Sequence, residues 1–269
     1  MKKALAAMAI TVWASIATAE EYVRFIGSDG SGKNGAVNLP EHWEGGTIPF
    51  GTKTGLITKS VNIWAGQPLT AFSLRQTGGL IKAPTGLQLR GGPEGSGVGT
   101  VYIIEDPNTN YTSYVNLEMA KDKAIVFWSQ FGGKCELSLL SGHIETGVLT
   151  LNAPDKGIIN VRDGIFHVGK MTGGKGVLNM LTAGTGAVVV DVLGCTLGEF
   201  KLNFETGNNG SFTISQKDGG ASADGIWQYL IGNRQLSVDG KVVKDPARFE
   251  ITTEGTSSTI KLASEVILG

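Results

Sequence analysis

Between residues 133 and 215 the chain repeats one short pattern, an alternating strand that ends in glycine. The closing glycines are Gly142, Gly164, Gly184 and Gly207, at steps of 22, 20 and 23 residues. A second apolar segment follows each glycine. A unit this short cannot bury its apolar face alone, so such units stack and pair their strands in parallel. The glycine-closed segments are 136–142, 158–164, 178–184 and 202–207, and those after them are 147–151, 165–168, 187–190 and 211–214.

Alternation within these strands predicts which side chains face inward. Successive residues of a strand point to opposite sides, so apolar residues at every second position define a buried face. Glycine is expected at the corners, because it adopts positive φ at little cost. The predicted inward residues are Leu137, Leu139, Ile159, Val161, Leu202 and Phe204, and the predicted outward residues are Ser138, Asn160 and Asn203.

The same strand spacing is also compatible with a β-sandwich or jelly roll, in which the period reflects only the spacing of turns. The recurring glycine position favours a β-solenoid. On this interpretation residues 20–60 form an N-terminal entry segment, residues 61–220 the repeats, and residues 221–269 a C-terminal cap.

The predicted cap departs from the repeat. Helical spacing of apolar residues predicts a short helix over 223–231. Residues 235–243 read as a strand, an Asp-Gly turn and a second strand. Two further alternating strands are expected at 248–252 and 259–263. A solenoid needs an atypical terminal unit of this kind to cover its last open edge.

The N-terminus has the three parts of a secretory signal peptide. Lys2 and Lys3 are followed by an apolar stretch over 4–16 and by the small-x-small sequence at 17–19. The apolar stretch is shorter than the roughly 20 residues that span a bilayer. We therefore predict a signal peptide over 1–19 with cleavage after Ala19, which leads to a periplasmic, extracellular or cell-surface location and no stable membrane insertion.

The charge and composition of the chain restrict the classes of partner that it is expected to bind. Without Lys2 and Lys3 the chain holds 21 basic and 24 acidic residues, a net charge of about −3. A near-neutral chain with no basic cluster argues against a nucleic-acid partner. The 40 glycines are about twice the usual share, yet 41% of residues are apolar, which indicates a glycine-rich folded chain rather than a disordered one.

The two cysteines, Cys135 and Cys195, leave two alternatives open. An exported protein can form a disulfide, so the two residues are a candidate pair. Two cysteines in a chain this long do not make a disulfide scaffold, and each can instead be a small buried apolar side chain.

No motif predicts a metal or a cofactor. Residues 27–34 approach a phosphate-binding P-loop, but Asn34 replaces the required Ser or Thr and no helix pattern follows. The same loop is a weak calcium candidate, because Asp29 is its one acidic residue. His143 and His167 follow their repeat glycines at different offsets, so they are not expected to align into a metal site.

Four polar residues are candidates for a ligand-binding or catalytic group on one wall. They are Arg162, Asp163, Asp191 and Glu205. Polysaccharide-cleaving enzymes use paired carboxylates, but Asp163 and Glu205 are expected two coils, about 10 Å, apart, which is slightly wide for an inverting pair. A solvated charged corner is the alternative. We therefore predict no catalytic residues, and retain Arg162, Asp163 and Glu205 as ligand-binding candidates.

Among the tryptophans, Trp43 is the candidate for a surface that stacks on sugars. It lies in the turn-rich segment 42–49. Trp128 follows the apolar residues 124–127 and is expected in the core, and Trp227 is expected to anchor the predicted helix.

The segment 42–49, with its tryptophan, glycines and proline, and the closing series of strand, short helix and strand pair from 203–207 through 259–263 carry a family resemblance. The chain resembles secreted bacterial proteins with autotransporter-passenger-like β-helix repeats. The resemblance implies a right-handed parallel β-helix on or outside the cell, and it assigns no catalytic residues, because such proteins share a scaffold and not one activity.

These observations favour a non-enzymatic secreted or cell-surface protein. Its repetitive wall would serve adhesion, extracellular glycan binding or self-association. The alternative is a polysaccharide lyase or glycoside hydrolase on the same scaffold, which requires several carboxylates facing one groove.

Overall fold

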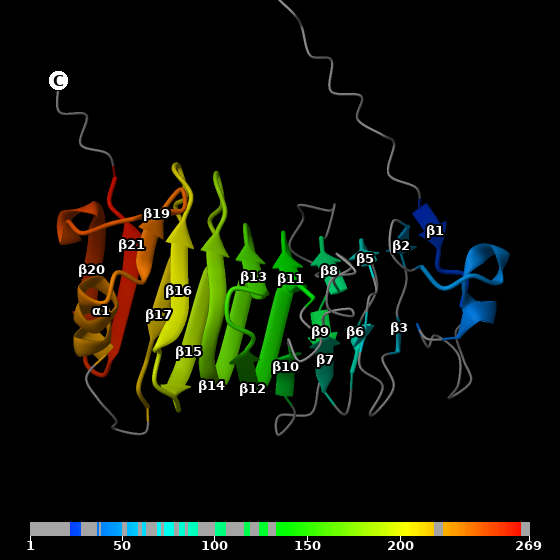
Figure 1. The fold of residues 1–269 in the computed structure, drawn as a ribbon, viewed down its shortest axis with the longest axis horizontal. Coiled ribbons are helices and arrows are strands. Elements are labelled where there is room, and N and C mark those ends of the chain that lie inside the picture. The colour runs from blue at the N-terminus through cyan, green and yellow to red at the C-terminus, as the bar shows by residue number, and fades with distance from the viewer. Residues whose placement is uncertain are drawn as a thin grey trace, which may run out of the picture.

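The structure is a computed structural model, and Figure 1 shows its strands side by side along the long axis. The predicted signal peptide at 1–19, the P-loop-like residues 28–34 and the side chain of Trp128 lie outside the described residues. The structure describes residues 22–27, 37, 39–49, 53–58, 61–62, 69–70, 73–77, 81–83, 86–90, 100–105, 116–118, 124–128, 133–217 and 223–264.

The chain is all-β, and most of its strands belong to three ladders of parallel pairs. From β11 to β17 the chain visits ladder A, ladder B and ladder C in turn and then returns to A, and we call one such passage a coil. Long strands bend through the corners, so β14 contributes to all three ladders.

Ladder A consists of β1 (Tyr22–Arg24), β2 (Thr54–Ile57), β5 (Ser73–Gln76), β8 (Thr100–Ile104), β11 (Cys135–Leu139), β13 (Gly157–Val161), the end of β14 (Ile165–Met180), β16 (Glu199–Phe204) and β18 (Leu236–Val238). Ladder B consists of β3 (Val61–Asn62), β6 (Ile81–Lys82), β9 (Asn116–Glu118), the starts of β12 (His143–Asn152), β14 and β15 (Ala187–Leu193), and β17 (Ser211–Ile214). Ladder C consists of β4 (Leu69–Thr70), β7 (Leu87–Arg90), β10 (Ala124–Trp128), the end of β12, the middle of β14 and the end of β15.

The three ladders bury one common apolar core. The inward positions predicted from alternation are confirmed, because all six side chains are at most 1% exposed. Burying a large apolar side chain contributes roughly 1.5–3 kcal/mol, so each coil adds to a continuous core that no single coil could form. The six residues are Leu137, Leu139, Ile159, Val161, Leu202 and Phe204.

Glycines at the corner after ladder A allow the coils to stack closely. Gly142, Gly164 and Gly207 have φ values of 112°, 92° and 80°. A Cβ on Gly164 would lie 2.1 Å from the carbonyl oxygen of Gly142 in the neighbouring coil. The prediction is wrong in one detail at the third corner, where Ala183 has the positive φ of 54° and carries the turn.

The C-terminal part contains the predicted helix and two hairpins. α1 (Ala223–Gly232) is followed by β18 and β19 (Lys241–Val242), which are joined through Asp239 and Gly240 at positive φ. After the 3-10 turn η3 (Pro246–Arg248), β20 (Phe249–Glu254) and β21 (Ser257–Leu262) form an antiparallel pair. Because β21 also pairs with β17, this hairpin extends ladder B (Figure 1).

Trp227 fixes α1 against the end of the core, as the sequence predicts. Its side chain is fully buried and its indole N–H donates to Ser258 Oγ at 3.0 Å. Its ring meets Phe212 edge-on, with centroids 5.5 Å apart. None of the helices in the described ranges has the length and apolar character that a bilayer-spanning helix needs.

Candidate binding wall

A row of polar side chains crosses successive strands on the outer face of ladder A. Asn160 of β13 pairs with Asn179 of β14, which pairs in turn with Asn203 of β16. Each asparagine stands between two inward apolar residues of its strand, so alternation places the amide on the outer face. The same row continues to Ser138 of β11 and Ser237 of β18. We call these five side chains the amide row.

The amides are joined in one direction. Asn179 Nδ2 donates to Asn160 Oδ1 at 2.8 Å, and Asn203 Nδ2 donates to Asn179 Oδ1 at 3.2 Å. Ser237 Oγ donates to Asn203 Oδ1 at 2.9 Å. Every donor therefore lies C-terminal to its acceptor, and the side chains of neighbouring strands hold one another in register.

Both ends of the amide row are closed by other groups. Asn160 Nδ2 donates to Ser138 Oγ at 2.9 Å and to Glu136 Oε1 at 2.7 Å. Glu136 also pairs with Lys134 at 2.6 Å. At the other end the backbone N–H of Gly240 donates to Asn203 Oδ1 at 2.9 Å. Among the three asparagines, Asn179 at the centre therefore makes the fewest side-chain hydrogen bonds.

The ligand-binding candidates Arg162 and Asp163 form contacts at the corner after ladder A. Asp163 Oδ1 accepts from the backbone N–H of Thr185 at 3.0 Å and from its hydroxyl at 3.1 Å. Arg162 Nε lies 3.3 Å from Asp163 Oδ2, and its Nη2 lies 3.7 Å from Glu105 Oε1. Glu105 also binds Arg75. Asp163 therefore joins neighbouring coils, and Arg162 reaches Glu105 across the intervening strand β11.

Glu205 has a similar role two ladder steps farther along. Its Oε2 accepts from the backbone N–H of Thr182 at 2.8 Å. In the next coil Asp239 accepts from both the hydroxyl and the backbone N–H of Thr206, and these hydrogen bonds lower the pKa of Asp239. Asp163 and Glu205 are separated by β14, as predicted, and both stabilise turns.

The expectation that Asp191 shares this wall is wrong. Asp191 lies between the ladder B and ladder C parts of β15, because the strand bends there. Its Oδ2 lies 3.1 Å from His167 Nε2, and its Oδ1 lies 2.7 Å from Lys217 Nζ. Burial raises the pKa of Asp191, but the hydrogen bonds from Lys217 and His167 outweigh this effect and keep the pKa below its usual value.

The two histidines do not align with each other across the strands. His143 pairs with Ile165, and His167 pairs with Glu145.

The prediction that Trp43 offers a sugar-stacking surface is also wrong. Trp43 is 1% exposed, and its indole N–H donates to the carbonyl of Val37 at 2.8 Å. Phe25 packs edge-on against it, with centroids 5.1 Å apart. The turns η1 (Pro40–His42) and η2 (Glu44–Gly46) place Trp43 against the first strands of ladder A. Its large apolar ring is removed from water there, which stabilises the fold.

Cys135 and Cys195 do not form a disulfide with each other. Cys135 begins β11, whereas Cys195 precedes β16, three strands farther along ladder A. Three ladder steps correspond to about 14 Å, well beyond the roughly 7 Å that a disulfide bridges between Cα atoms. Burial raises the pKa of the Cys195 thiol.

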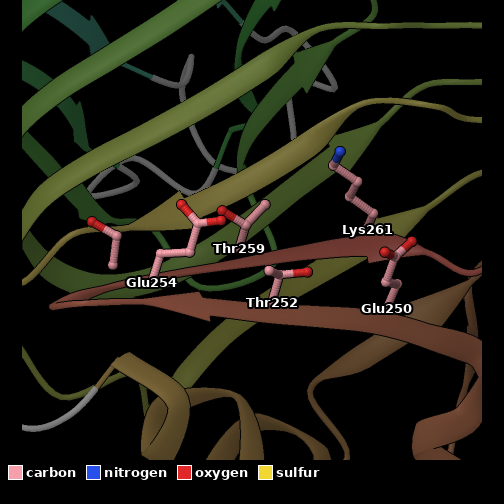
Figure 2. A pocket seen from close by; sticks show the side chains of 6 residues that line it. Glu250, Thr252, Glu254, Thr259 and Lys261 are labelled. Carbon is pink, nitrogen blue, oxygen red and sulfur yellow. The ribbon is translucent and has the colours of Figure 1, made fainter.

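A shallow groove lies on the outer face of the β20–β21 hairpin. Figure 2 shows the side chains that rise from this face, with Glu250 paired opposite Lys261. Its volume is about 240 Å³. Glu250 and Glu254 add two negative charges to β20, the edge strand, and edge charges of this kind disfavour pairing with further strands. The groove is lined by Glu250, Thr252, Glu254, Ser257, Thr259 and Lys261.

The described residues contain no group of three His, Cys, Asp or Glu side chains that could hold a metal ion. The sequence predicted the outward orientation of Asn160 and Asn203 but did not reveal that both form hydrogen bonds with Asn179. The available signal was the recurrence of apolar-Asn-apolar, at 159–161, 178–180 and 202–204. No protein-family model, curated protein or solved structure matches the chain.

Proposed function

We propose that the chain is a non-enzymatic secreted or cell-surface protein, built as a right-handed parallel β-helix with a C-terminal cap over 221–269, that binds an extracellular polymer through the outer face of ladder A. Parallel pairing in three ladders around one core supports the β-helix over a sandwich, whose sheets are antiparallel. The resemblance to autotransporter-passenger-like proteins and the predicted signal peptide support a location outside the cell.

The observation that carries the proposal is the amide row. Five neighbouring strands place hydrogen-bonding side chains in line, of which Ser138 is buried and the other four are half-buried. The amides hold one another in place, so a ligand would meet groups whose rotamers are already ordered. Ordering side chains before binding lowers the entropic cost of association.

Polymer binding is preferred to catalysis and to self-association, in which copies of the chain would stack end to end. The carboxylates considered for polysaccharide cleavage, Asp163 and Glu205, accept hydrogen bonds from neighbouring turns. At the C-terminal end, α1 covers the core through Trp227, and the charges of β20 disfavour strand addition.

The proposal is tested by binding of the purified protein to insoluble cell-wall polysaccharides in a co-sedimentation assay. The protein with Asn160→Ala, Asn179→Ala and Asn203→Ala is compared with Thr150→Ala/Thr172→Ala. The second variant also removes a hydrogen-bonded pair across neighbouring strands, but on ladder C. We expect binding to be lost in the first variant and retained in the second. Equal binding by the two variants would exclude ladder A as the contact surface.

A further inference from the structure

The centre of the amide row retains unused hydrogen-bonding capacity. A side-chain amide offers two N–H donors and two acceptor lone pairs. Asn179 donates once and accepts once within the row, so one N–H and one lone pair remain. Asn160 keeps one lone pair, because its oxygen accepts from Asn179 alone. Asn203 keeps one N–H, while Ser237 and Gly240 occupy its oxygen.

A hydroxyl group matches this arrangement. Each hydroxyl donates one hydrogen bond and accepts others, so it can accept from one asparagine and donate to its neighbour. Strands of one ladder are about 4.8 Å apart, so the remaining groups repeat at that interval along the stack. This interval is close to the length of one sugar ring in an extended chain. A polysaccharide lying across the strands would therefore meet an asparagine at nearly every residue.

Two apolar side chains lie beside the amides, between Glu136 and Lys201 on the same line across the strands. Ile158 lies two residues before Asn160 on the same face of β13, and it pairs with Val177 of β14. Both side chains are half-buried. Aliphatic side chains of this kind provide contact for the C–H faces of sugar rings, while the neighbouring amides bind the hydroxyl edge.

The charges around the row are balanced. Three lysines on this face are each paired with a carboxylate, which leaves little net field to attract a polyanion. Such a surface suits an uncharged partner better than nucleic acid or an acidic glycan. The pairs are Lys134–Glu136 at 2.6 Å, Lys175–Glu199 at 2.8 Å and Lys201–Asp155 at 2.5 Å.

From these observations we infer that the partner of ladder A is an uncharged linear polysaccharide that lies along the stack, with its hydroxyl groups on Asn160, Asn179 and Asn203 and its ring faces on Ile158 and Val177. This inference rests on the proposed function, and it specifies the chemistry of the ligand for the same surface.

The test is affinity electrophoresis with paired soluble polymers. Hydroxyethylcellulose and mannan serve as uncharged probes, and carboxymethylcellulose and alginate serve as anionic probes. We expect an uncharged polymer to retard the protein, with a change of less than about twofold between roughly 50 and 200 mM salt, because few counterions are released. Asn179→Ala is expected to weaken binding about fivefold to tenfold, while Thr172→Ala has no effect.

The other outcomes separate the inference from the function on which it rests. Binding of the anionic probes alone, lost in Asn179→Ala, would overturn the uncharged partner and keep ladder A as the binding wall. Retardation that Asn179→Ala leaves unchanged would overturn the site. Retardation by none of the four polymers would overturn the uncharged-polysaccharide inference, and co-sedimentation with cell-wall material would then decide the proposed function separately. Circular dichroism of each variant confirms that it is folded.

Discussion

Replacing Gly164 by alanine tests whether the corner glycines are required by their backbone conformation, by the closeness of the next coil, or by both. Gly164 has a φ of +92°, and an added Cβ would lie 2.1 Å from the carbonyl oxygen of Gly142. A non-glycine residue in the left-handed region costs about 1–2 kcal/mol. Overpacking a close contact costs about 1–3 kcal/mol more. We therefore expect Gly164→Ala to lower the free energy of unfolding by about 2–5 kcal/mol.

Two other glycines separate these contributions. Gly207 has a φ of +80°, but the nearest atom to its added Cβ is Thr182 Oγ1 at 3.6 Å, an ordinary contact. Gly207→Ala should therefore cost only the conformational part, about 1–2 kcal/mol. Gly198 has neither a positive φ nor an atom within 4 Å of its added Cβ, so Gly198→Ala should change stability by less than about 0.5 kcal/mol.

The measurement is urea-induced unfolding of the three variants, followed by circular dichroism and extrapolated to water. The expected order of destabilisation is Gly164, then Gly207, then Gly198. Equal losses for Gly164→Ala and Gly207→Ala would refute the role of close coil stacking. A loss for Gly207→Ala no larger than that for Gly198→Ala would refute the role of positive φ.

Three further predictions use other contacts. Trp227→Phe should lower the free energy of unfolding by about 1–3 kcal/mol in urea titrations, because Ser258 Oγ loses its buried indole donor; an unchanged midpoint would contradict this. Because the folded pKa of Asp191 is lowered, its stabilising effect is full above the unfolded value of 3.8 and is lost as pH falls through the folded pKa, so Asp191→Asn should flatten the loss of thermal stability between about pH 5 and 2; parallel profiles would count against it. Thiol titration of the unfolded, unreduced protein should detect both Cys135 and Cys195, whereas a mass lower by two hydrogens would indicate a disulfide.

Much of the local structure could be predicted because it depends on neighbouring residues. Alternation placed Ile159 and Leu202 in the core, since the pleat of a strand leaves two faces. Helical spacing located α1, and the Asp-Gly pair located the turn between β18 and β19. These features require no knowledge of which strands are neighbours.

The errors concern positions whose environment depends on distant segments. Asp191 lies beyond a bend within one continuous strand, and no single residue type marks where that strand leaves ladder B. Trp43 is buried because Phe25 and Gly55 of β2 pack against it, which its own polar, turn-rich segment does not reveal. The amide row depends on register, because Asn160, Asn179 and Asn203 meet only when three strands align.

The three ladders also determine how the molecule would respond to mechanical force. Their backbone hydrogen bonds run along the stack, so tension between its two ends separates neighbouring coils by breaking these bonds one after another. Force along a strand would instead load many bonds at the same time. In ladders B and C the first strands, β3 and β4, are only two residues long, and β6 is equally short. All interfaces between coils carry the same tension, so those joined by the short strands between residues 61 and 90 are expected to separate before those formed by the long strands β12 and β14.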